Sequence, residues 1–158
     1  MLWRSAIRVI AVIIAAVGIR QLSVVPYRDN LLIGAVERRS SLAQSSNVPR
    51  AVGLAQRNLR DLDDAERSRR LDPNWYLLYG ANCELLGRWH DAAEVYTRAL
   101  KIDQRPEIYV NRGMVMLQLG RTDDAAADLA TAARFDPAVL NDLDGDLRER
   151  VAAAAGIH

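Results

Sequence analysis

The chain has 158 residues, 50% of them hydrophobic, and a formal net charge of +1. A charge so close to zero creates no broad field for nucleic acid, and no basic stripe is interleaved with aromatic residues. The single cysteine permits no intrachain disulfide.

The N-terminus carries an apolar segment. Its uncharged run 9–19 would span about 16 Å as a helix, too short for a bilayer core of about 30 Å. Residues 6–25 are long enough if Arg8 and Arg20 extend to opposite interfaces. We therefore expect residues 1–26 to be a transmembrane anchor or signal segment. A retained anchor is favoured over a cleaved secretory signal, and a buried helix of the following domain is the third alternative.

Basic residues lie on both sides of this segment, so the positive-inside rule alone does not orient it. A short tail before a single span most often stays in the cytoplasm, which favours the rest of the chain outside. Lys101 is the only lysine, and an arginine bias suggests a GC-rich bacterial genome. The expected location is the bacterial inner membrane, single-pass, with the remainder in the periplasm.

Residues 27–49 are predicted to form a juxtamembrane helix and a linker. Leu31, Leu32 and Val36 keep helical spacing, and the helix is expected to reach about Ala43. Its apolar face could contact lipid, a partner or the domain that follows, and the sequence leaves all three open.

A longer helix is predicted over residues 50–72. One stripe of small and apolar residues runs along it, and Leu71-Asp72-Pro73 closes it. The stripe consists of Ala51, Leu54, Ala55, Leu59, Leu62 and Ala65. Because the segment lacks the glycine pattern of a first helix, we interpret it as an N-terminal half-repeat.

A period of 33 residues organises the second half (106 − 73 for its prolines). Pro73, Gly80, Gly87, Ala92 and Ala99 recur as Pro106, Gly113, Gly120, Ala125 and Ala132. A proline can start a helix, a glycine can end it, and small residues let two helices approach closely. The period therefore predicts two helix–turn–helix units, 73–105 and 106–137, which stack on a shared core.

A capping helix is predicted over residues 138–158, where apolar residues alternate with charged ones. Its stripe consists of Val139, Leu140, Leu143, Leu147 and Val151. Gly145 would weaken such a helix by about 1 kcal/mol relative to alanine.

The two units resemble the tetratricopeptide repeat, strongly so over 73–137. Its pattern has an early aromatic residue, a small residue four positions later, a glycine before the turn, and small residues flanking a bulky one on the second helix. The matching residues are Tyr76, Gly80, Gly87, Ala92, Tyr96 and Ala99, then Tyr109, Gly113, Gly120, Ala125, Leu129 and Ala132, with Asp136-Pro137 closing the second unit. Gln104 replaces the first closing proline, Arg112 replaces a usually apolar residue, and the period is one short of the usual 34.

The resemblance implies an all-α fold: an antiparallel helix-hairpin solenoid, here preceded by a single N-terminal transmembrane helix. It also implies that the first helix of each unit lines a concave groove that binds a peptide or a partner protein. The residues that face it are Asn74, Leu77, Ala81, Glu84, Glu107, Val110, Met114 and Gln118. Leu77, Ala81, Val110 and Met114 would form an apolar strip in this groove. The alternative is that the chain's own flanking helices cover this strip.

Binding of a peptide's C-terminal carboxylate is disfavoured, because the family members that do so carry Lys, Arg and Asn in this groove. Leu77 and Ala81 stand where Lys and Asn would be needed, and only Asn111 agrees.

Catalytic and metal-binding motifs are not found. His90 has no second ligand at metal-binding spacing, and Asp142–Asp146 cannot form a calcium loop because Leu140 and Val151 would fall on its ligand positions. Cys83 falls on the apolar side of its helix, as a buried structural thiol would. We expect no enzyme, no cofactor, no nucleic acid and no small-molecule substrate.

The predicted function is a membrane-anchored interaction scaffold in a cell-envelope assembly. The alternative is a structural subunit whose N-terminal helix packs among the transmembrane helices of a larger complex.

Overall fold

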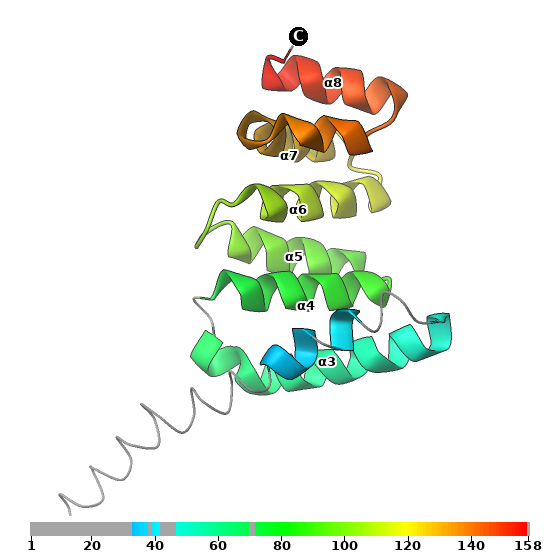
Figure 1. The fold of residues 1–158 in the computed structure, drawn as a ribbon, viewed down its shortest axis with the longest axis vertical. Coiled ribbons are helices and arrows are strands. Elements are labelled where there is room, and N and C mark those ends of the chain that lie inside the picture. The colour runs from blue at the N-terminus through cyan, green and yellow to red at the C-terminus, as the bar shows by residue number, and fades with distance from the viewer. Residues whose placement is uncertain (1–32, 38, 42–46, 70–71, 158) are drawn as a thin grey trace, which may run out of the picture.

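The computed structural model describes residues 33–37, 39–41, 47–69 and 72–157 (Figure 1). The regular elements among them are all helical, which confirms the predicted class. They are α3 (Val48–Arg69), α4 (Pro73–Leu85), α5 (Trp89–Ala99), α6 (Pro106–Gln118), α7 (Thr122–Phe135), the 3₁₀ helix η2 (Pro137–Asp142) and α8 (Gly145–Ala155). The helices stack in chain order into one column that ends at the C-terminus (Figure 1).

The predicted membrane anchor, residues 6–25, lies outside the described residues. Within the described ranges, no helix combines the length and the apolar character that crossing a bilayer requires.

The first unit is the hairpin of α4 and α5. The Asp72 carboxylate accepts the backbone N–H of Asn74 at 3.0 Å, and Pro73 occupies the first turn, where its missing N–H costs nothing. Gly87, with φ of 67°, ends the helix in the left-handed region. At the crossing with α5, a Cβ added to Gly80 would lie 2.3 Å from Cζ of Tyr96, so only glycine fits.

The second unit repeats this hairpin with α6 and α7. Gly120 ends α6 with φ of 71°, and a Cβ on Gly113 would lie 2.9 Å from Cγ of Leu129. The two predicted hairpins and their close crossings are therefore confirmed.

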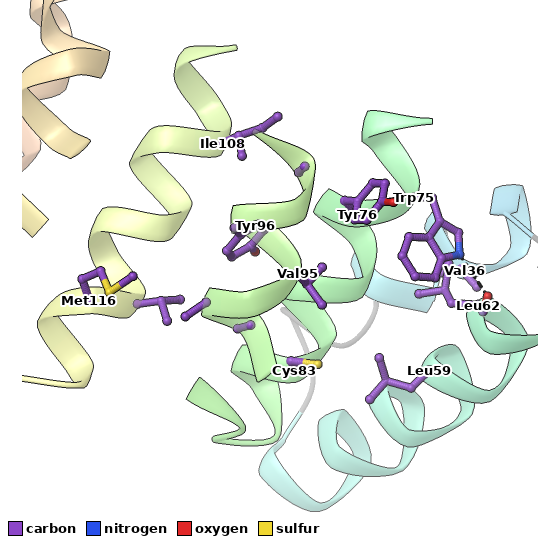
Figure 2. Close-up of a cluster of buried hydrophobic side chains, with 14 of the residues drawn as sticks. Val36, Leu59, Leu62, Trp75, Tyr76, Cys83, Val95, Tyr96, Ile108 and Met116 are labelled. Atoms are coloured by element: carbon purple, nitrogen blue, oxygen red, sulfur yellow. Dashed lines mark hydrogen bonds between the residues drawn. The ribbon is translucent and has the colours of Figure 1, made fainter. Parts of the chain in front are cut away.

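The interior contains two clusters of buried apolar side chains. The larger one joins α3 to α6 around Trp75, Tyr96 and Ile108, and Figure 2 shows its main members. The Trp75 indole N–H donates to the carbonyl of Leu62 on α3 at 2.9 Å. The smaller cluster joins α7 to η2 and α8 around Leu129 and Val151. Each helix therefore shares buried apolar side chains with its neighbours in the column, as the fixed period predicts.

Residues 33–37 and 39–41 are helical and pack against α3 and α4. Ile33 and Val36 are buried in the larger cluster. Of the three partners that the sequence left open, this segment contacts the domain itself. The helix α3, predicted as an N-terminal half-repeat, consequently has a packed partner before it in the chain.

A buried polar network attaches this segment. Arg39 donates from Nε to Oδ1 of Asn58 at 2.8 Å and forms an ion pair with Asp61. The amide of Asn58 donates to Oδ1 of Asn82 at 2.8 Å, and both amides donate to the hydroxyl of Ser40. Asn58 and Asn82 are fully buried, and these bonds satisfy groups that would otherwise be costly to desolvate.

Arg112, the departure from the repeat pattern, has a partner on α7. Its Nε and Nη2 donate to the two oxygens of Asp128, each at 2.7 Å, and its Nη1 donates to Thr97 at 3.1 Å. The hydrogen bond to Asp128 raises the pKa of Arg112, which favours the charged guanidinium. A bidentate ion pair therefore links α6 to α7 at a position where tetratricopeptide repeats usually have an apolar residue.

The C-terminal region differs from the single helix predicted over 138–158. Asp136 accepts the N–H of Ala138 at 2.9 Å and starts the short helix η2, and α8 begins only at Gly145. Gly145 has φ of 43° and stands at the start of α8, where it does not weaken a helix interior. The helix α8 packs on α7 through buried Val151 and places its charged residues outward, as a cap should.

Candidate functional site

A pocket of about 470 Å³ lies between the first helices of the two units. The helix α4 supplies Ala81, Asn82, Glu84 and Leu85, and α6 supplies Asn111. Tyr96 and Ser40 complete the lining. We call this the α4 pocket.

A second pocket, of about 340 Å³, lies between α6 and η2, and we call it the α6 pocket. Its lining residues are Pro106, Glu107, Val110, Asn111, Asp136, Ala138, Val139 and Asp142. Asn111 lines both pockets, so they adjoin at this side chain, and we call the two pockets together the groove. This groove is the candidate site.

Half of the predicted site residues line the groove. Ala81 and Glu84 belong to the α4 pocket, and Glu107 and Val110 belong to the α6 pocket.

The other four predicted residues line neither pocket. Leu77 is half-buried and packs against the larger core cluster, while Met114 is 42% exposed one helical turn beyond Val110. Gln118 is exposed at the end of α6, and Asn74 accepts a hydrogen bond from Arg105 at 3.1 Å.

The structure adds residues that sequence patterns did not assign to the groove. Asn82 and Tyr96 belong to the buried stripe of the hairpin, yet both reach the α4 pocket. Ala138, Val139 and Asp142 of η2 line the α6 pocket. The sequence predicted one helix over residues 138–158 in place of η2 and α8. Ser40 comes from the segment before α3, so the chain's own flanking residues form part of the groove wall.

The charged residues known to line the groove are all acidic: Glu84, Glu107, Asp136 and Asp142. The Tyr96 hydroxyl donates to Oε1 of Glu84 at 2.5 Å. Burial raises the pKa of Glu84, and this hydrogen bond opposes the rise.

A third pocket, of about 180 Å³, lies among α3, α4 and α5 and differs in charge. Its lining includes Asp63, Asp91 and Glu94 together with Arg88 and Arg98. Opposite charges so close together largely cancel, so this pocket offers a ligand no single sign of charge.

Other candidate reactive groups are structural. Cys83 is fully buried, and burial raises the pKa of its thiol to about 11, which disfavours the nucleophilic thiolate. His90 is exposed near the start of α5. Over the residues that the structure describes, no group of three or more His, Cys, Asp and Glu side chains could hold a metal ion.

No protein-family model and no curated protein matches the chain. Among solved structures, it is similar to a thermophilic TPR (tetratricopeptide repeat) protein of Thermus thermophilus, with 28% identity and a TM-score of 0.64. That match covers 89% of this chain and 69% of the other. A T3SS complex from Aeromonas hydrophila matches at 20% identity and a TM-score of 0.53, over 77% of this chain and 76% of the other. The chain therefore has a TPR-like fold, and these likenesses suggest a protein–protein interaction scaffold.

Proposed function

We propose that the chain is a membrane-anchored scaffold that binds a segment of a partner protein in the groove along α4 and α6. The observation that carries the proposal is the meeting of two pockets at Asn111, beside exposed Met114. A groove of this kind suits an extended or helical peptide, and methionine adapts to apolar side chains of different shapes. The amide of Asn111 can both donate and accept, so it can pair with a peptide backbone.

The proposed membrane anchor and cellular location are inferred from the sequence alone. Residues 6–25 support attachment to the bacterial inner membrane, with the repeats in the periplasm and the partner in a cell-envelope assembly. The likeness to a T3SS complex agrees with a role in an assembly. No motif supports catalysis or a cofactor, so we propose no enzymatic activity.

Replacing Met114 with glutamate should reduce partner recovery at least tenfold, because an exposed apolar side chain one helical turn from the lining residue Val110 becomes charged. The measurement is quantitative mass spectrometry of proteins that co-purify with the full chain from detergent. Met114 suits this test better than Leu77, which also packs into the core.

Ile102→Glu is the matched control, since Ile102 is 38% exposed in the turn after α5, whereas Met114 lies on α6 one helical turn from the lining residue Val110. Equal recovery with Met114→Glu and with the unaltered chain would show that the groove is not the binding site. A stoichiometric integral membrane partner that survives both substitutions would instead favour a structural subunit.

Arginine at both Ile13 and Val17 should release the chain from membranes. Each arginine at the centre of a span costs about 2.5–3.5 kcal/mol on insertion scales, so two should prevent stable insertion. The measurement is carbonate extraction of isolated membranes, with Ile13→Leu and Val17→Leu as the control pair. An unaltered chain that carbonate extracts would contradict the anchor.

A further inference from the structure

The α6 pocket combines apolar walls with an acidic rim. Val110 and Val139 are half-buried and pack against the smaller core cluster, so the walls are held in place. The carboxylates of Glu107, Asp136 and Asp142 belong to exposed residues around these walls. The pocket therefore offers an apolar surface to the body of a side chain and negative charge to its tip.

Charge complementarity selects the occupant. An arginine or lysine places an aliphatic stem on apolar surface and keeps its cationic head beside carboxylates. A purely apolar side chain would desolvate the carboxylates without pairing them, and an acidic one would be repelled. The C-terminal carboxylate of a peptide is disfavoured for the same reason.

The α4 pocket carries negative charge as well. Glu84 is the charged residue of the α4 pocket, and no arginine or lysine lines either pocket in the part of the chain that the structure describes. The whole chain carries a net charge of +1, so this acidic bias is local to the groove. The third pocket, with charges of both signs, shows no such bias.

We propose that the partner segment is a basic peptide, with apolar residues near Met114 and an arginine or lysine seated in the α6 pocket. This inference rests on the proposed function, since it names the chemistry of the segment that the groove binds. The cationic head lies among the carboxylates of Glu107, Asp136 and Asp142. The remaining groove, lined by Asn111 and Glu84, tolerates polar and further basic residues but no acidic ones.

The test starts from a phage-displayed library of random 12-residue peptides, selected on the full chain in mild nonionic detergent. We expect arginine and lysine to be enriched about threefold over the unselected library. Fluorescence anisotropy then measures the dissociation constant of the strongest peptide. Replacing its arginines with citrulline, which keeps the shape and removes the charge, should weaken binding about tenfold. Raising the salt concentration should weaken binding as well.

The matching protein variant is Glu107→Gln with Asp142→Asn, which should also weaken binding about tenfold. Asp64→Asn with Glu149→Gln removes the same charge from exposed positions outside both pockets and should change binding less than twofold. Circular dichroism checks the fold of each variant, and Asp142→Asn alone serves if the double variant unfolds.

Two failures are distinguishable. If neutral or acidic peptides are selected and Met114→Glu abolishes their binding, the groove is the site and the basic partner is wrong. If selected peptides bind Met114→Glu as tightly as the unaltered chain, or no peptide is enriched, the proposed function falls together with this inference.

Discussion

Replacing Gly80 with alanine should lower the free energy of unfolding by about 2–3 kcal/mol. The new Cβ would lie 2.3 Å from Cζ and 2.7 Å from the hydroxyl oxygen of Tyr96. The ring cannot move away easily, because it is fully buried and its hydroxyl is bound to Glu84. The cost exceeds the gain in helix propensity, which is about 1 kcal/mol for glycine to alanine. Urea unfolding followed by circular dichroism measures the difference.

Gly53→Ala is the matched control, because Gly53 also lies inside a helix and has no atom within 4 Å of an added Cβ. This change should stabilise the protein by up to about 1 kcal/mol. Adding Tyr96→Leu to Gly80→Ala should recover part of the loss, because the clash is smaller opposite leucine: an added Cβ lies 2.9 Å from Leu129 at Gly113 but 2.3 Å from Tyr96 at Gly80. Equal stabilities of Gly80→Ala and Gly53→Ala would show that α4 and α5 do not cross as closely as described.

Replacing Asp128 with alanine should lower the free energy of unfolding by about 2 kcal/mol. The change removes two hydrogen bonds of 2.7 Å and leaves the half-buried Arg112 guanidinium with its hydrogen bond to Thr97. The partial exposure of Arg112 keeps the loss below that of a fully buried pair. Chemical denaturation measures the loss.

The double variant Arg112→Leu with Asp128→Ala tests the cause. It restores an apolar residue at the departure from the repeat pattern and leaves no unpaired charge, so its stability should lie within about 1 kcal/mol of the unaltered chain. A double variant that is less stable than Asp128→Ala would contradict this account of the pair.

The hairpins were predictable because their determinants are local and repeat. A proline, a helix-ending glycine and small crossing residues lie at fixed distances along the chain, and each acts on its own turn or on the adjacent helix. Gly80 and Gly113 show this most directly, since a pattern in the sequence corresponds to a close approach in space.

The buried polar network and the Arg112–Asp128 ion pair could not be predicted, because they are contacts between distant segments, which periodicity does not reveal. Ser40 and Asn82 are 42 residues apart, and an asparagine gives no sign in a sequence that it is buried and bonded. Arg112 was recognisable as a departure, but nothing in its own repeat pointed to Asp128. Of the residues predicted to face the groove, Ala81 and Val110 line the two pockets. The separate helix η2 was not predicted, because one apolar stripe runs through both η2 and α8.

The packing of residues 33–37 and 39–41 onto α3 and α4 would limit how far the groove can stand from a bilayer to which the chain was anchored. If residues 6–25 span the membrane, only residues 26–32 separate the span from Ile33, which is already part of the core. A fully stretched tether of that size reaches less than about 30 Å. The first unit would therefore be held at the lipid surface with little freedom to swing, and would meet partners that present their basic segments next to the membrane.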